Sequence, residues 1–210
     1  KNKETIAICG DYDADGMTST ALLVDFLTSI NAHCLPIIPS RESEGYGLNN
    51  NIIDRISDQS INLIITVDNG VSAQETISYA FKLGIDVIIT DHHSFKGQLN
   101  NVYALVHPIT LPENSEYKYL AGVGLAYVMA YTINQMSQIK GSLALSRDLF
   151  CIGTIADMAK LKGANRYWLK QWLPQIKNTT SIGLKGILDK AKISKTVISA
   201  QDIAFKVAPR

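Results

Sequence analysis

The 210-residue chain has few cysteines and no long apolar run. Its three cysteines, Cys9, Cys34 and Cys151, lie far apart and form no CxxC pair. This pattern excludes a disulfide-rich scaffold, gives no support to a structural zinc site and favours a reducing, cytoplasmic setting. No stretch approaches the roughly 18 apolar residues of a membrane helix, and the N-terminal residues do not resemble a signal peptide, so we expect no membrane partner.

A strong excess of either charge is also missing, because 20 basic and 19 acidic side chains leave a net charge of +1. The charges are nevertheless unevenly distributed. Residues 1–159 carry 9 basic and 17 acidic side chains, whereas residues 160–210 carry 11 basic and 2 acidic ones. An acidic site beside a basic flank suits a polyanionic substrate, although a solvated helical surface gives the same pattern.

Apolar segments of strand length alternate with helical patterns over the first half of the chain. The predicted strands are Thr5–Cys9, His33–Ile38, Leu63–Val67, Asp86–Thr90 and Ala104–Val106. The predicted helices are Met17–Asn31, Asn51–Asp58, Ser72–Leu83, Gly122–Gln135, Leu143–Ile155, Asn165–Leu173 and Gly183–Lys190. We expect Ser72 to cap its helix and Gly84 to end it. The alternation predicts an α/β fold with a parallel sheet covered on both faces, followed by a helical section.

The sharpest chemical feature is the run Asp11-Tyr12-Asp13-Ala14-Asp15-Gly16, directly after the first predicted strand. Three carboxylates at alternate positions repel one another unless cations neutralise them. The same pattern opens an EF-hand calcium loop, so that interpretation must be weighed. An EF-hand needs a glutamate at the loop position that Leu22 occupies here, and a helix where this chain has a strand.

Further acidic residues and histidines follow two other predicted strands. Asp68 comes directly after Leu63–Val67, and the triplet Asp91–His93 comes directly after Asp86–Thr90. Each has a simpler explanation when taken alone. An aspartate after a strand often caps the next helix, and a histidine beside an aspartate is often a surface pair. The coincidence of three such sites favours a shared function.

The ends of parallel strands offer that shared function. Ligands of an open parallel sheet bind beyond the carboxyl ends of its strands. Asp13, Asp15, Asp68 and His92 are therefore expected to converge there. Carboxylates with an imidazole suit Mg²⁺ or Mn²⁺ better than a soft metal, and several carboxylates can hold two ions for attack on a phosphate.

These motifs resemble, in chain order, those of the RecJ family within the DHH phosphoesterase superfamily. The matching segments are Gly10–Thr20, Glu44–Leu48, Val67–Gly70, Asp91–His93, Leu120–Gly124, Gly153–Asp157 and Ala208–Arg210. The resemblance implies a mostly parallel five-stranded sheet flanked by helices. It also implies a metal-binding DHH domain over residues 1–160, and a helical basic segment of the same lobe over 161–210 that leads to a second domain.

The resemblance implies an activity and assigns roles within it. The activity is 5′-to-3′ removal of nucleotides from single-stranded DNA in repair and recombination, with two Mn²⁺ or Mg²⁺ ions as cofactors. The implied metal ligands are Asp13, Asp15, Asp68, His92 and Asp157. Asp13 would bind one ion, Asp68 would bridge, and the other three would bind the second. His93 would contact the scissile phosphate as a catalytic residue with Asp68, while Asp11 and Asp91 would orient ligands.

The chain departs from this family pattern at three positions. Cys9 stands where many DHH enzymes carry a metal-binding histidine, so we expect it at the edge of the metal site, and whether it ligates a metal stays open. His107 stands where RecJ sequences usually have asparagine, which leaves its role open. Trp172 replaces a small residue, and with Trp168 it lies on one helix face, where core packing is favoured over base stacking.

Two segments offer candidate contacts to a nucleic acid. In the polar loop after the second strand, Arg41 could hold a phosphate and Tyr46 could stack on a base, unless the loop is merely solvated. Gly122 and Gly124 lie at a predicted helix start, where backbone N–H groups could face a phosphate, although close helix packing explains them equally well. Basic residues after Asp157 could line a groove; these are Lys160, Lys162 and Arg166.

Two other functions remain open. A small-substrate DHH phosphodiesterase, acting on oligonucleotides or cyclic dinucleotides, would share the metal ligands. An inactive scaffold like the replication factor Cdc45 would share the fold but would not need an intact ligand set. Bound manganese separates the scaffold from the enzymes, and end-labelled single strands tested against dinucleotides separate the two enzymes.

Overall fold

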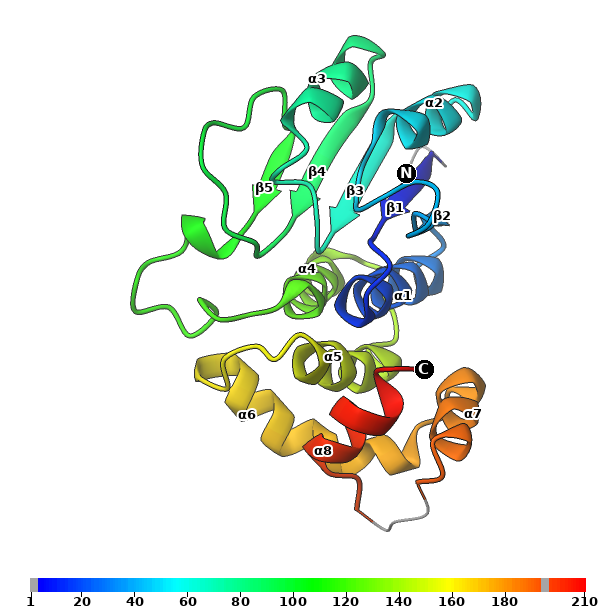
Figure 1. Ribbon diagram of the computed structural model, residues 1–210, viewed down its shortest axis with the longest axis vertical. Coiled ribbons are helices and arrows are strands. Elements are labelled where there is room, and N and C mark those ends of the chain that lie inside the picture. Colours follow the sequence, from blue (N-terminus) through cyan, green and yellow to red (C-terminus); the bar gives the residue numbers. More distant parts are fainter. Residues whose placement is uncertain (1–3, 194–196) are drawn as a thin grey trace.

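The computed structural model describes residues 4–193 and 197–210. Within them, five strands form one all-parallel sheet in the order β2-β1-β3-β4-β5. The strands are β1 (Thr5–Cys9), β2 (His33–Ile37), β3 (Leu63–Val67), β4 (Asp86–Thr90) and β5 (Ala104–Val106). The predicted α/β fold with a five-stranded parallel sheet is therefore confirmed (Figure 1).

The register explains why the strands are so apolar. Ile8 of β1 pairs with Pro36 on one side and Ile65 on the other, and Ile65 pairs in turn with Ile88 of β4. Pro36 is tolerated because β2 lies at the edge of the sheet, where a missing N–H donor leaves no central ladder bond unmade. Strands covered on both faces bury side chains of both orientations, as β3 does at Ile64 to Val67, which produces continuous apolar runs.

Helices cover both faces of the sheet. They are α1 (Ala14–Ser29), α2 (Asn50–Asp58), α3 (Gln74–Lys82), α4 (Gly122–Met136), α5 (Ala144–Ala156), α6 (Gly163–Trp172), α7 (Ile182–Lys190) and α8 (Ala200–Asp202). Short turns of other helical types occupy η1 (Pro108–Thr110), η2 (Leu173–Asn178) and η3 (Ile203–Val207). Helices α2 and α3 lie on one face, α1 and α4 on the other, and α5 packs beneath α1 and α4 (Figure 1). Among the described residues, no helix has the length and apolarity needed to cross a membrane.

Two apolar cores result from this layering. The smaller lies between the sheet and α2–α3 and includes Ile53 and Ile77. The larger joins the other face of the sheet to α1, α4 and α5, where Phe26 and Phe150 are fully buried. Leu169, Ile176, Leu188 and Ile203 belong to this same larger core. Helices α6 and α7 and the turn η3 therefore share one apolar core with α5.

The N-cap of α3 differs from the sequence prediction, whereas the packing of the two tryptophans agrees with it. Helix α3 has Ala73 as its N-cap, without a side-chain bond, so the prediction of Ser72 as the cap was wrong. Trp168 and Trp172 stack with ring centroids 5.3 Å apart and pack edge-on against Phe150. Core packing, rather than base stacking, therefore accounts for both rings.

Candidate metal centre

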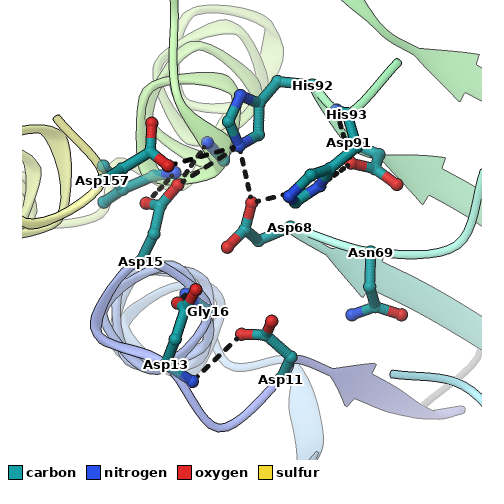
Figure 2. Close-up of polar contacts among 12 residues, drawn as sticks. Asp11, Asp13, Asp15, Gly16, Asp68, Asn69, Asp91, His92, His93 and Asp157 are labelled. Carbon is teal, nitrogen blue, oxygen red and sulfur yellow. Dashed lines mark hydrogen bonds and ion pairs between the residues drawn. The ribbon is translucent and has the colours of Figure 1, made fainter. Parts of the chain in front are cut away.

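The candidate site lies where the strand order reverses. The chain leaves β1 toward β2 on one side and reaches β3 on the other, so the loops after β1 and β3 diverge and leave a crevice between them. The loop after β4 borders the same crevice. Figure 2 shows acidic side chains from the first two loops and the histidines from the third pointing toward one another.

The loop after β1 presents its carboxylates through the start of α1. Asp13 is exposed and caps the helix, accepting the N–H of Gly16 at 2.9 Å. Asp11 is fully buried beside the same turn. A Cβ at Gly16 would lie 1.7 Å from Asp11 Oδ1, so only glycine allows the helix to begin this close to the carboxylate. The glycine that ends the DxDxDG run is thus a packing requirement of the acidic loop.

Asp15 is buried and held by another helix. Its Oδ2 accepts the N–H of Gly122 at 2.7 Å and its Oδ1 accepts the N–H of Val123 at 2.8 Å, both in the first turn of α4. The positive end of the α4 dipole thus supports this carboxylate. Gly124 is buried and its N–H donates to the carbonyl of Ala121. The glycine segment therefore serves helix packing and ligand support here, and does not present free N–H groups to a phosphate.

Asp68 lies at the centre of the site. Its φ of 62° is left-handed, a conformation that aspartate and asparagine adopt more readily than most residues. Asp68 Oδ1 lies 3.0 Å from His92 Nε2 and 3.9 Å from His93 Nδ1. It caps no helix, because α3 begins at Gln74 with Ala73 as its N-cap. The left-handed backbone turns the carboxylate toward the histidines.

Asp91 holds the second histidine of the triplet. Its Oδ1 accepts the backbone N–H of His93 at 2.9 Å and contacts the ring Nδ1 at 2.8 Å, while its Oδ2 accepts the N–H of Val71. Burial alone would raise the pKa of Asp91, but these bonds outweigh it and the pKa lies below its usual value. The bond to Asp91 raises the pKa of His93 to about 9.

The fourth contributor comes from the end of α5. Asp157 is the C-cap residue of that helix, where unpaired carbonyl groups make the surroundings negative. Its Oδ1 lies 3.9 Å from His92 Nε2, and Asp15 Oδ2 lies 3.7 Å from the same nitrogen. His92 therefore meets three carboxylates, those of Asp15, Asp68 and Asp157.

These side chains form three overlapping groups with a ligand geometry. The groups are Asp11, Asp13 and Asp68; Asp68, His92 and His93; and Asp15, His92 and Asp157, each with potential ligand atoms within 4.8 Å of one another. Several of these atoms have no hydrogen-bond partner among the described residues although they are buried, namely Asp11 Oδ2, Asp68 Oδ1 and His92 Nε2. Asp68 Oδ1 and His92 Nε2 lie 3.0 Å apart without forming a hydrogen bond. Buried polar atoms without a hydrogen bond are costly, and a bound cation would satisfy all three. Oxygen-rich ligands with imidazole suit Mg²⁺ or Mn²⁺.

The electrostatics of the cluster lead to the same conclusion. Burial and the charge of Asp11 raise the pKa of Asp68 to about 9. Burial, and then the charge of Asp13, raises the pKa of Asp11 to about 6, and the pKa values of Asp15 and Asp157 are also raised, chiefly by burial. Buried carboxylates this close together do not all ionise at neutral pH without a counter-charge. Divalent cations bound among them stabilise the ionised form, because their positive charge dominates the local electrostatics.

Cys9 lies beside this loop but its side chain does not enter the cluster. The thiol is 1% exposed and packs in the smaller core with residues of α2 and α3. Burial raises its pKa to about 12, so it stays a neutral thiol at physiological pH. Only its backbone carbonyl contributes, by accepting a hydrogen bond from Asn69 Nδ2 at 3.0 Å.

The two predicted substrate contacts border the site through aromatic rings. Tyr46 is half exposed, donates its hydroxyl to the carbonyl of Asp68 at 3.1 Å and meets the His93 ring edge-on at 6.2 Å. Arg41 lies 5.4 Å from the ring centroid of Tyr12, which in turn contacts Tyr46. The loop thus lies against the metal cluster, with Tyr46 next to it and Arg41 farther out.

Two buried polar residues near the cluster had no role assigned from the sequence. Asn69 donates to the carbonyls of Cys9 and Val67 and accepts the N–H of Leu48, so it joins the loops after β1, β2 and β3. His107 bonds to the backbone of the DHH triplet. Asn69 lay inside a recognised motif, which could have drawn attention to it. His107 stood out only as a departure from the family pattern.

Comparison with known proteins agrees with this geometry. The profile of the "DHH family, N-terminal domain" matches residues 5–154. The single-stranded-DNA-specific exonuclease RecJ of Bacillus subtilis (strain 168) is 38% identical over 208 residues, covering 99% of this chain and 26% of the relative. RecJ of Escherichia coli (strain K12) is 34% identical over 217 residues, covering 98% of this chain and 38% of the relative. The chain thus spans between a quarter and two fifths of the length of these relatives.

Solved structures extend the comparison to three dimensions. A crystal structure of exonuclease RecJ bound to manganese matches with a TM-score of 0.87 at 32% identity, covering 99% of this chain and 52% of that one. RecJ of Thermus thermophilus in complex with Mn²⁺ matches with a TM-score of 0.83 at 30% identity, covering 99% of this chain and 29% of that one. Since the family profile covers most of the chain and includes the three loops that form the cluster, the chain belongs to the DHH family.

Proposed function

We propose that this chain carries the metal centre of a phosphodiesterase that removes nucleotides from single-stranded DNA in the 5′-to-3′ direction. The proposed cellular role of this activity is DNA repair and recombination. The observation that carries the proposal is the convergence, at the carboxyl edge of the sheet, of buried ligand atoms of Asp68 and His92 that form no hydrogen bond. The similarity to proteins named as single-stranded-DNA-specific exonucleases supports the choice of substrate.

The proposed cofactor is a pair of Mn²⁺ or Mg²⁺ ions. The proposed ligands are Asp13, Asp15, Asp68, His92 and Asp157. Asp68 is the proposed bridge, because it belongs to two of the three ligand groups and lies between the loop after β1 and the histidines. Bound there, the ions would supply the Lewis acid that polarises a phosphodiester and activates water.

The chain's own residues orient the reacting groups. Asp91 fixes the His93 ring through Nδ1, which leaves Nε2 as the atom that can donate to a phosphoryl oxygen. The first turn of α4 holds the Asp15 carboxylate in place through two backbone N–H groups. Tyr46, edge-on to His93 and half exposed, is the proposed stacking surface for a base, and Arg41 is the proposed contact for a phosphate beyond it.

The test is metal-dependent digestion of labelled DNA by the 210-residue chain. A 5′-labelled strand, a 3′-labelled strand, a blunt duplex and a dinucleotide are incubated with Mn²⁺ and with EDTA. We expect Mn²⁺-dependent release of the 5′ label from the single strand, with the duplex resistant. An Asp157→Asn variant should lose this activity, because the carboxylate meets the same His92 nitrogen as Asp15 and Asp68.

Asp58→Asn is the matched control, since Asp58 is an exposed carboxylate at the end of α2. It should behave as the wild type. Cleavage of the dinucleotide alone would replace the proposed function by a small-substrate phosphodiesterase. A chain that binds no Mn²⁺ and cleaves none of the substrates would contradict catalysis and favour a scaffold.

A further inference from the structure

A pocket opens on the α5 side of the metal cluster. It has a volume of about 200 Å³, and His92 and Asp157 form one of its walls. Lys118, Tyr119 and Lys160 form another. Figure 2 shows Asp157 and His93 on opposite sides of the cluster, so this pocket lies across the reacting centre from the Tyr46 loop.

Two lysines gather at the Tyr119 ring, of which Lys160 lines the pocket and Lys162 approaches the ring from outside it. Lys160 Nζ lies 5.7 Å and Lys162 Nζ lies 5.8 Å from the ring centroid of Tyr119. Lys118 is already paired, with Glu113 at 3.0 Å and the carbonyl of Leu111 at 3.2 Å. Within the described residues, neither Lys160 nor Lys162 forms an ion pair with a carboxylate. Both ammonium groups are therefore available to an anion.

The backbone that carries these lysines is held in place. After Asp157 ends α5, Met158 adopts a φ of 57° and the Ala159 N–H returns to the carbonyl of Thr154 at 3.3 Å, which reverses the chain. Asn165, 1% exposed, donates its side-chain amide to the carbonyl of Tyr119 at 2.6 Å and to that of Lys160 at 3.1 Å. One buried amide thus ties the tyrosine segment to the lysine segment.

The metal cluster is therefore flanked on both sides by a ring with a cation beside it. On one side Arg41 lies by Tyr12, whose ring contacts Tyr46 beside His93. On the other side the two lysines lie by Tyr119, which lines the same pocket as Asp157. A strand crossing the centre meets a positive group before and after the reacting phosphate. Such an arrangement offsets the repulsion between phosphates and an acidic site.

We propose that the Tyr119 subsite, defined by Tyr119, Lys160 and Lys162, binds a nucleotide of the single strand that neighbours the scissile phosphate, on the side opposite Tyr46. Lys160 and Lys162 hold the phosphate of this nucleotide, and the Tyr119 ring keeps their ammonium groups beside the cluster. This inference rests on the proposed function, because it names how that site takes a strand rather than an isolated phosphodiester.

The test compares a Lys160→Gln/Lys162→Gln double variant with the wild type and with a Lys170→Gln/Lys177→Gln control, which removes two exposed lysines elsewhere on the helical section. Two substrates are used with Mn²⁺: a short oligothymidylate and the p-nitrophenyl ester of thymidine 5′-monophosphate, which is too small to span the centre. We expect the ratio of kcat/KM for the strand to kcat/KM for the ester to fall roughly tenfold in the double variant. The log–log slope of kcat/KM for the strand against salt should be weaker by about 0.7, because the two lysines neutralise one phosphate. The control should keep the wild-type ratio.

Binding provides a readout that does not depend on catalysis. Fluorescence anisotropy of a labelled oligothymidylate in EDTA should show weaker binding by the double variant than by the control. Equal affinity of the two variants, or equal loss on strand and ester, would overturn the subsite. Failure of the proposed function has a different signature, since the wild type would then cleave no strand at all. Tighter binding by the control variant than by the double variant would still support the subsite in that case.

Discussion

His107 Nε2 lies 2.9 Å from the backbone carbonyl oxygen of His93. The other ring nitrogen, Nδ1, accepts the N–H of Ile109 at 2.9 Å, so the neutral ring carries its proton on Nε2 and donates it to that carbonyl. His107 is 6% exposed and directly follows β5. It therefore joins the edge of the sheet to the loop that presents the histidine pair, and we expect it to act as a positioning residue.

Removing this bond should impair turnover more than substrate binding. We expect His107→Ala to lower kcat by about tenfold to a hundredfold with a smaller change in KM, because small displacements of a reacting group are costly. His107→Asn should restore most of kcat, since an asparagine can accept the Ile109 N–H and offer an amide donor. Steady-state kinetics on a single strand measures both. An alanine variant with wild-type kcat would show that the bond serves folding alone.

The ionised carboxylate of Asp68 should destabilise the metal-free protein, and the same carboxylate should be required for metal binding. With its pKa at about 9 instead of the ordinary 3.8, the folded chain binds more protons than the unfolded chain between these values, so the stability of metal-free protein falls as pH rises through that window. We expect Asp68→Asn, which tolerates the left-handed backbone, to raise the melting temperature in EDTA and to flatten its decline with pH. The same variant should lose Mn²⁺ binding and hydrolysis.

Thermal melts across the range from mildly acidic to mildly alkaline pH, with and without Mn²⁺, check this prediction. Asp58→Asn again serves as the control, because its carboxylate is exposed at the end of α2. A lower melting temperature for Asp68→Asn in EDTA, or retained Mn²⁺-dependent hydrolysis, would contradict the assignment of Asp68 as a charge held for cations.

Gly122 should be intolerant of any side chain. A Cβ at this position would lie 2.5 Å from the Cβ of Asp68 and 2.6 Å from its Oδ1. We expect Gly122→Ala to cost about 1–3 kcal/mol of stability and to weaken Mn²⁺ binding, because the helix start or the carboxylate must shift. Gly186→Ala is the control, since an added Cβ there meets nothing within 4 Å in α7, and it should stabilise the chain by about 1 kcal/mol. Equal effects of the two substitutions would refute the close approach.

Cys9 should behave as a core residue. A serine at this position would bury a hydroxyl among apolar side chains, so we expect Cys9→Ser to lower stability by about 1–3 kcal/mol. Calorimetric titration with Mn²⁺ should give the wild-type affinity. A large loss of affinity would return Cys9 to the metal centre.

The strands and the acidic loops could be predicted because their signals are local. Runs such as Leu63–Val67 are apolar throughout, and the carboxylates stand directly after them. The support of Asp15 by Gly122 and Val123 could not be predicted, since it joins residues 107 and 108 positions apart in the sequence. The left-handed backbone of Asp68 was equally hidden, because aspartate is common in both extended and left-handed conformations.

The last helical turns could not be located from the sequence for a different reason. The residues from Ala200 to Val207 form a short helix and a π-helical turn whose Ile203 is fully buried. The sequence predicted a helical segment over 161–210 but did not locate these turns within it. The segment is too short for a recognisable apolar period, and its conformation depends on packing into the larger core.

The most direct test of the metal centre is an anomalous difference map from a crystal of the 210-residue chain soaked in Mn²⁺, recorded at the manganese absorption edge. We expect two peaks that share Asp68, one toward Asp13 and the other among Asp15, His92 and Asp157. A single peak without Asp68, or no peak at the carboxyl edge of the sheet, would contradict this assignment.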